Sequence, residues 1–88
     1  MSASRWKNCV WVESRCLLFL GASNASVRRG AVQVLGNLAR EYGDRIDLIN
    51  TREALRRLAK DADTGVRTAV KDSLDKVMHR LTLHKKRE

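Results

Sequence analysis

Two cysteines and two histidines are the residues of this sequence whose chemistry could build a metal site. They are Cys9, Cys16, His79 and His84. Thiolate and imidazole are common zinc ligands, but the cysteine pair and the histidine pair stand at opposite ends of the chain. Their spacings are not those of known zinc fingers. The sequence therefore predicts no metal site and no cofactor.

The sequence likewise gives little support for nucleophilic or acid–base catalysis. Ser14, Ser26 and Ser73 have no histidine or acid at a recognisable spacing that could activate their hydroxyl groups. Asp72 and Asp75 are expected on an exposed helix face, where solvated carboxylates are the simpler interpretation. The sequence also lacks a phosphate-binding glycine loop and an HExxH motif. We predict that the protein is not an enzyme and has no catalytic residue.

The charge and composition indicate a small, basic, folded domain. The chain has 88 residues, with 18 Lys and Arg against 10 Asp and Glu, so that its net charge is +8. A hydrophobic content of 43% argues against disorder, and the length suits a single domain. The positive charge favours acidic partners, nucleic acid among them, although a solvated surface rich in lysine and arginine explains it as well.

The cysteines and the apolar segments bear on the compartment. On a helix, Cys9 and Cys16 would lie on one side but too far apart for a disulfide. Without a signal peptide, they are expected to be reduced thiols. The apolar run from Cys16 to Ala22 is much shorter than a membrane span. We predict a cytoplasmic or nuclear protein that does not interact with a membrane.

An internal repeat organises the chain. The segment from Asn24 to Leu38, NASVRRGAVQVLGNL, is repeated 39 residues later as the segment from Asp63 to Val77, DTGVRTAVKDSLDKV. Both copies contain a Val-Arg pair with a leucine eight residues after the valine. A repeat of this period is typical of helical solenoids, in which neighbouring units cover each other's apolar faces. The sequence therefore predicts an all-α fold, a short α-solenoid of about two helical hairpins.

Apolar residues at helical spacing predict four helices. These helices are expected at about 5–20, 25–42, 51–60 and 64–81. Asn24 and Asp63 are the expected N-caps of the second and fourth helices. Asn50 and Glu53 have the spacing of a capping box before the third helix, and Gly43 is expected to end the second helix.

The second and fourth helices are each expected to bury one apolar face. In the second helix this face consists of Val27, Ala31, Val34, Leu35, Leu38 and Tyr42. In the fourth helix it consists of Val66, Val70, Leu74, Val77 and Leu81. Gly30 is expected to allow the close approach of a neighbouring helix, because it has no side chain.

The two copies together resemble HEAT repeats. In that family the second helix of a repeat opens with Val-Arg, with an alanine four residues and a leucine eight residues after the valine. The matching residues are Val27, Arg28, Ala31, Leu35 and Gly36 in the first copy and Val66, Arg67 and Leu74 in the second. Asp61 and Asp63 supply the acidic turn of the second copy. The departures are Ala22, Asn24 and Val70, which replace two acids and an alanine.

The resemblance covers the chain from about Cys16 onward and implies right-handed stacking of antiparallel helix pairs. It divides a single domain, 1–88, into a first repeat at about 12–42, a second repeat at about 46–82 and a basic tail at 83–88. It also implies a structural ladder across the repeat junction, formed by Arg28, Asp61, Asp63 and Arg67. In this ladder Arg28 would reach Asp61 or Asp63.

The resemblance implies a non-catalytic protein-interaction or scaffold module, which would bind an acidic protein through the second helix of each repeat. The residues expected to contact that partner are Arg29, Gln33, Asn37, Arg40, Thr68, Lys71, Asp72 and Arg80. The alternative is a nucleic-acid-binding module that uses the same face and the tail Lys85 to Arg87. Such binding would be weak and blind to sequence, because no base-reading motif is present. A third hypothesis is a piece of a tubulin-binding HEAT array, since Arg5-Trp6-Lys7 resembles the opening of those arrays.

The first helix is apolar around much of its circumference, and solenoids generally need about three repeats to be stable. A patch of Trp6, Trp11, Leu17 and Phe19 is therefore expected to mediate association. Two outcomes fit this expectation. The chain would self-associate through the first helix, or it would dock onto a longer repeat array.

Overall fold

The computed structural model of the chain describes the backbone from Ser2 to Arg87 and the side chains from Val10 to Thr82. Over residues 2–87 it contains four α-helices and no β-strand. The helices are α1 (Ser2–Phe19), α2 (Ala25–Tyr42), α3 (Leu48–Arg57) and α4 (Thr64–Arg87). The predictions of an all-α chain and of four helices are confirmed.

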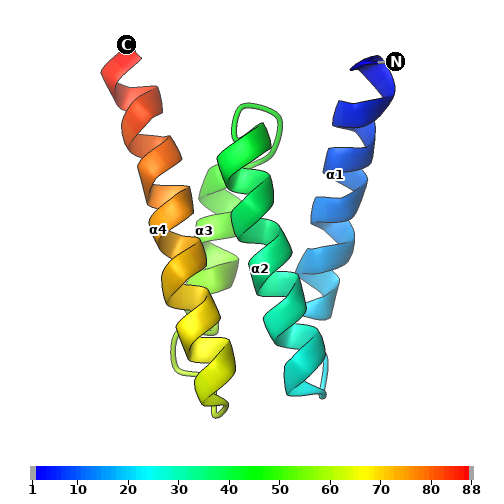
Figure 1. Cartoon of the computed structure of the whole chain (residues 1–88), viewed down its shortest axis with the longest axis vertical. Coiled ribbons are helices and arrows are strands. Elements are labelled where there is room, and N and C mark those ends of the chain that lie inside the picture. The colour runs from blue at the N-terminus through cyan, green and yellow to red at the C-terminus, as the bar shows by residue number, and fades with distance from the viewer. Residues whose placement is uncertain (1, 88) are drawn as a thin grey trace.

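Each helix runs antiparallel to the next one along the chain (Figure 1). As a result α2 and α4 run in the same direction, and they lie side by side with the most extensive helix–helix contact in the molecule. α1 packs on α2, and α3 packs on α4 and on α2. The molecule therefore consists of two helical hairpins, α1–α2 and α3–α4, in a body measuring 37 × 29 × 15 Å along its principal axes.

The predicted caps of α2 and α4 are confirmed. The Asn24 Oδ1 atom accepts a hydrogen bond from the backbone N–H of Ser26 at 2.8 Å. The Asp63 Oδ1 atom accepts one from the backbone N–H of Val66 at 3.0 Å. Each bond satisfies one of the amide groups that the first turn of a helix leaves without a partner. α2 ends before Gly43, as predicted, but Gly43 is the C-cap with a right-handed backbone and not a C′ residue in the left-handed region.

α3 begins earlier in the chain than predicted. Asp47 is its N-cap, because the Asp47 Oδ1 atom accepts a hydrogen bond from the backbone N–H of Asn50 at 2.9 Å. The predicted capping box of Asn50 and Glu53 is therefore wrong, and Asn50 lies inside the first part of the helix. The earlier start places Leu48 and Thr51 on the buried side of α3.

α4 extends beyond its predicted end at Leu81. It continues to Arg87, so the backbone of the segment that was predicted as a basic tail is helical as far as this residue. No glycine or proline occurs after Gly65 to stop the helix. The side chains of this segment lie outside the described ones.

The core lies where the two hairpins meet. Its completely buried side chains, each less than 2% exposed, are Leu35, Leu55, Val32, Val66, Val70, Val77, Thr51 and Ser73. Three valines of α4 in this set belong to its predicted inner face. Leu74 and Leu81 are only partly buried and pack against the edge of the core.

The buried face of α2 differs from the predicted one. Val27 and Val34 are 42% and 39% exposed, whereas Val32, Gly36 and Ala39 are buried. The prediction assumed that α2 covers one neighbour with one apolar stripe. In fact α2 packs on α1 along one side and on α4 along the other. Its buried residues therefore lie on two sides of the helix and not on a single stripe.

α2 and α4 approach each other closely at Gly36. The Ser73 hydroxyl of α4 donates a hydrogen bond to the carbonyl oxygen of Val32 at 2.8 Å. A Cβ atom on Gly36 would lie 2.5 Å from Ser73 Oγ and 2.8 Å from Ser73 Cβ, which is too close. A Cβ atom on Gly30 would have nothing within 4 Å. The prediction of a close approach at Gly30 is therefore wrong, and Gly36 has that role.

A buried carboxyl group lies between α1 and α3. Glu13 is 7% exposed and accepts a hydrogen bond from the Thr51 hydroxyl at 3.0 Å. Burial raises the pKa of Glu13, and the hydrogen bond from Thr51 opposes this effect without cancelling it. This contact joins the first helix of one hairpin to the first helix of the other.

We expect Glu13→Gln to stabilise the protein at pH 7 and to lose this advantage near pH 4. The amide still offers an oxygen to Thr51 but carries no charge to desolvate. Because the folded-state pKa of Glu13 is raised, its favourable contribution is complete below the ordinary value of 4.5 and is lost as the pH rises through the higher folded-state value. Urea unfolding of both proteins at the two pH values measures the difference. An advantage that does not change with pH would contradict the prediction.

Candidate interaction surface

The turns that precede α2 and α4 share several hydrogen bonds. Arg28 Nη1 donates to the carbonyl oxygen of Ala22 at 2.8 Å, and Arg67 Nη1 donates to that of Asp61 at 2.6 Å. In both cases the acceptor lies six residues before the arginine. The first backbone hydrogen bonds of the two helices correspond as well. Positions 39 residues apart, which we call equivalent positions, therefore make corresponding backbone contacts at these turns.

Arg28 also joins the two hairpins. Its Nε and Nη2 atoms donate to Oδ2 and Oδ1 of Asp61 at 2.9 and 3.1 Å, and Nη1 also donates to the Ser23 carbonyl oxygen at 2.9 Å. The two side chains of the ion pair are 17% and 8% exposed. Hydrogen bonds from the Arg28 guanidinium hold the pKa of Asp61 below its usual range. The pair thus fixes the α3–α4 turn against the start of α2.

The other residues of the predicted ladder lie around this ion pair. Asp63 does not contact Arg28; its backbone N–H donates to Asp61 Oδ1 at 2.9 Å, and its own carboxylate caps α4. Arg67 reaches Asp61 only at the backbone carbonyl, and it donates to the Thr64 hydroxyl at 3.0 Å. The described residues supply one bidentate Arg–Asp pair at this junction.

We expect Arg28→Lys to lower the melting temperature more than Arg67→Lys. A lysine cannot make two parallel hydrogen bonds to a carboxylate while it also reaches two carbonyl groups. Because the folded-state pKa of Asp61 is lowered, its contribution is complete above the ordinary value of 3.8 and is lost as the pH falls through the lower folded-state value. The difference between the variants should therefore shrink from pH 7 to pH 2. Thermal scans measure it, and equal melting temperatures at pH 7 would refute the role of Arg28.

An exposed polar stripe runs along α2 and α4. It consists of Arg29, Gln33, Asn37 and Arg40 of α2 and their equivalents Thr68, Asp72, Lys76 and His79 of α4. Lys76 Nζ donates to Asn37 Oδ1 at 3.1 Å, which joins two equivalent positions, and forms an ion pair with Asp72 at 3.4 Å. The two helices therefore lie side by side without a shift in register.

The polar stripe contains six of the eight predicted partner-binding residues. Lys71 lies outside it, about 200° around α4 from Ser73 and so on the side away from α2. Arg80 is partly buried, with an ion pair to Asp44 at 3.5 Å and a hydrogen bond to the Arg40 carbonyl oxygen at 3.5 Å. Lys76 and His79 were not predicted, although the 39-residue spacing from Asn37 and Arg40 could have identified them.

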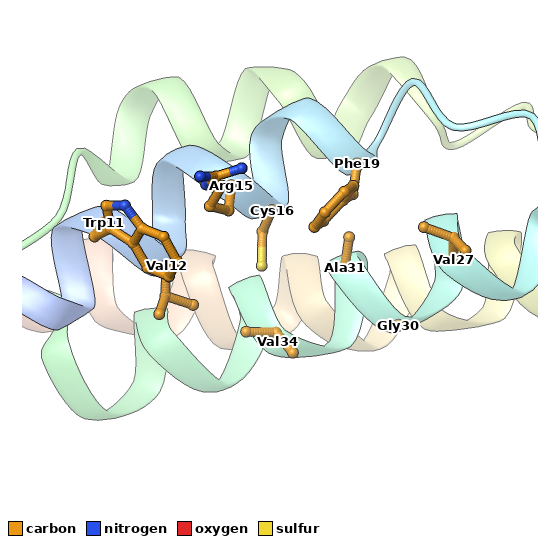
Figure 2. A pocket seen from close by; sticks show the side chains of 9 residues that line it. All are labelled: Trp11, Val12, Arg15, Cys16, Phe19, Val27, Gly30, Ala31 and Val34. Carbon is orange, nitrogen blue, oxygen red and sulfur yellow. The ribbon is translucent and has the colours of Figure 1, made fainter.

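An apolar groove of about 560 Å³ lies between α1 and α2 (Figure 2). It is lined by Trp11, Val12, Arg15, Cys16, Phe19, Val27, Gly30, Ala31 and Val34. Trp11 and Phe19 are 60% and 48% exposed. The Arg15 guanidinium lies 4.9 Å from the centre of the Trp11 ring, a cation–π distance. Apart from Arg15, the groove offers a ligand little but apolar contact.

The predicted association patch is partly rearranged in the structure. Trp11 and Phe19 are exposed and line the apolar groove. Leu17 instead packs against the core. The exposed leucine of α1 is Leu18, whose side chain is 73% exposed. Trp6 lies outside the described side chains. The exposed apolar surface of α1 therefore continues onto α2 through the groove.

The residues considered for chemistry are scattered. Among the described residues, no three His, Cys, Asp or Glu side chains lie together in a way that could hold a metal ion. Cys16 is 7% exposed, and burial raises the pKa of its thiol, which therefore stays protonated at neutral pH. The Ser73 hydroxyl is buried and occupied by its bond to α2. Cys9 and His84 lie outside the described side chains, and His79 belongs to the polar stripe.

Comparisons of the chain with protein-family models, with curated proteins and with solved structures give no match. Within the described part of the chain, no helix is both long enough and apolar enough to cross a lipid bilayer. The polar stripe and the apolar groove are the two surfaces of the described residues that bear on the function.

Proposed function

We propose that this protein is a HEAT-type repeat module that binds another protein through the polar stripe and performs no chemistry. The observation that carries the proposal is the register of α2 and α4. The Lys76–Asn37 hydrogen bond joins equivalent residues, and Arg28 and Arg67 make equivalent contacts in the preceding turns. Two hairpins related by such a step are the elementary unit of a solenoid, whose second helices form a continuous binding surface.

The charges of the polar stripe favour an acidic protein as the partner. Arg29, Arg40 and Lys76 make it basic, and the single carboxylate, Asp72, is already paired with Lys76. The exposed large apolar side chains of the described region lie elsewhere. Exposed charges of this kind mainly raise the association rate of a complex, and added salt weakens their effect. A cytoplasmic or nuclear location suits this function and keeps Cys16 reduced.

A nucleic-acid-binding module is the second candidate, favoured by the net charge of +8. The polar stripe carries basic side chains that could meet the phosphates of a duplex. It has no Phe, Tyr or Trp side chain on which a base could stack, and its residues do not form a known base-reading motif. We therefore expect duplex DNA to bind weakly, without sequence preference, and only at low salt.

A matched charge-reversal experiment tests the proposed function. The stripe variant is Arg29→Glu with Arg40→Glu, and the control is Arg56→Glu with Arg57→Glu, which reverses as many charges on α3. All four arginines are exposed, so both variants should fold. A photo-cross-linker at position 33 should capture a protein partner in the wild-type and control backgrounds, and this capture should be lost in the stripe variant.

Two results would overturn the proposal. One is equal capture by the stripe variant and the control. The other is duplex DNA binding that depends on the stripe and is much tighter than the roughly 10⁻⁶ M limit of ordinary non-specific contacts. The second result would make nucleic acid the partner.

A further inference from the structure

The open side of α2 is equivalent to the buried side of α4. The apolar groove uses four residues of α2, and their equivalents on α4 are Val66, Ala69, Val70 and Ser73. Each of these α4 residues is at most 7% exposed. The Ser73 hydroxyl bonds to the Val32 carbonyl oxygen, so this face of α4 is the face that packs on α2. α2 presents the equivalent face to solvent.

The same equivalence holds in part for α1 and α3, although Asn50, the equivalent of Trp11, is exposed. Val12 and Cys16 of the groove correspond to Thr51 and Leu55 of α3, both of which are 0% exposed. Thr51 donates its hydroxyl to Glu13 of α1, so this side of α3 faces the first hairpin. The groove of the first hairpin is therefore the counterpart of the surface by which the second hairpin docks.

We propose that the apolar groove is the docking site for a further helical hairpin, whose second helix lies beside α2 as α2 lies beside α4. The inference rests on the repeat arrangement of the proposed function and adds a second binding surface to it. The established interface defines the occupant: α2 meets α4 with Val32, Gly36 and Ala39 on one side. The partner helix should likewise present an aliphatic residue, then a glycine or alanine four positions later and another small residue three positions after that.

The partner needs no arginine for this contact. Ala22 occupies the position equivalent to Asp61, which accepts the hydrogen bonds of Arg28 at the existing junction. A guanidinium from the docked hairpin would find no carboxylate at this position. Apolar contact along the groove, with Trp11 and Phe19 as the largest exposed side chains, must therefore hold the partner.

A second copy of this chain, stacked end to end, does not have the required surface. The α4 residues equivalent to Val32, Gly36 and Ala39 are Lys71, Asp75 and Met78. All three are exposed. If this face entered the groove, the charged side chains of Lys71 and Asp75 would be desolvated, which costs free energy. The Asp75 carboxylate would also lie where the close helix crossing requires a glycine. The outer side of α4 thus resembles the polar surface of a terminal repeat, and the groove is the open end of the stack.

A chain with a duplicated first hairpin tests the docking. Residues 8–46 are inserted a second time after residue 46, which adds one 39-residue repeat and keeps the register of the 88-residue chain. Trp6 and the first copy of Trp11 are replaced by phenylalanine, so that Trp11 of the middle hairpin is the only tryptophan. We expect the duplicated chain to unfold in a single transition at higher urea than the 88-residue chain. We also expect several-fold weaker quenching of Trp11 by acrylamide than in the 88-residue chain with Trp6→Phe.

The matched control is the same duplicated chain with Val32→Lys and Gly36→Asp in the first hairpin only, which copies the outer side of α4. Quenching of Trp11 should return to the value of the 88-residue chain, and the gain in urea midpoint should disappear. Val34→Lys in the middle hairpin should have the same effect from the other side of the contact. If neither change affects quenching or the midpoint, the first hairpin does not occupy the groove and the proposal is wrong.

Sedimentation of the 88-residue chain tests the remaining possible occupant of the groove, a second copy of the chain packed face to face. A closed dimer in which Trp11 is shielded would show that a second copy covers the groove face to face, and would also overturn the proposal. The charge-reversal experiment on the polar stripe uses different residues and a different readout. A failure of the docking site is therefore distinguishable from a failure of the proposed function.

Discussion

Replacement of Leu35 by alanine is expected to destabilise the protein by about 2–5 kcal/mol. Leu35 is 0% exposed and lies on α2, which packs on all three other helices. The truncation would leave a cavity that the surrounding helices cannot fill without moving. Leu55→Ala on α3, at another position that is 0% exposed, should cause a loss in the same range. Urea unfolding with linear extrapolation measures both changes.

The controls for this prediction are Leu74→Ala and Leu18→Ala. Leu74 is equivalent to Leu35, but it is only partly buried because no described helix lies beyond α4 on that side. Its loss should be clearly smaller than that of Leu35. Leu18 is 73% exposed, and its truncation should change stability by less than about 0.5 kcal/mol. A similarly small loss for Leu35→Ala would show that the hairpins do not meet where the structure places them.

Gly36→Ala and Gly30→Ala should shift the stability in opposite directions. In a helix, alanine is more favourable than glycine by up to about 1 kcal/mol. Gly30 has open space around it, so Gly30→Ala should keep this gain. At Gly36 the new Cβ atom would lie 2.5 Å from Ser73 Oγ, and overpacking of this kind costs about 1–3 kcal/mol. Gly36→Ala should therefore destabilise the protein in the same urea assay.

A double substitution checks the cause of the Gly36 effect. Ser73→Gly removes the two nearest atoms that the new Cβ would meet, Oγ and Cβ, and leaves Cα at 3.0 Å, at the expense of the hydrogen bond to Val32. If the clash is real, Gly36→Ala should cost less in the Ser73→Gly background than in the wild type, and this coupling free energy reports the contact directly. Equal costs in the two backgrounds would mean that α2 and α4 are farther apart at this crossing.

The parts of the fold that depend on local signals could be predicted from the sequence. Asn24 and Asp63 are strong N-caps that act within three residues, so the starts of α2 and α4 were predicted correctly. Asp47 was missed because Asn50 offered a competing cap signal. Whether Asp47 or Asn50 caps α3 depends on whether Leu48 and Thr51 are buried in the helix. The packing between the two hairpins decides whether they are buried.

The surfaces were harder to predict, because exposure depends on neighbours that a single helix pattern does not identify. Val27 and Val34 have the spacing of core residues, yet they line an open groove, whereas Val32 is 0% exposed. The polar stripe was predicted in six of its eight residues, since polar side chains at equivalent positions of a repeat remain on one side. Lys71 was misplaced because it was chosen for lying off the apolar stripe of its helix and not by its equivalence to Val32.

The central position of α2 has a consequence for the way in which the molecule opens. α2 contacts all three other helices and lies between α1 and α4, its two most extensive neighbours. α1 can separate while α2 stays packed on α4, and the second hairpin can separate while α1 stays packed on α2. No such partial opening frees α2 itself. The backbone amides from Val32 to Ala39 therefore exchange with solvent deuterium only when the whole chain unfolds, and their exchange rates report its global stability.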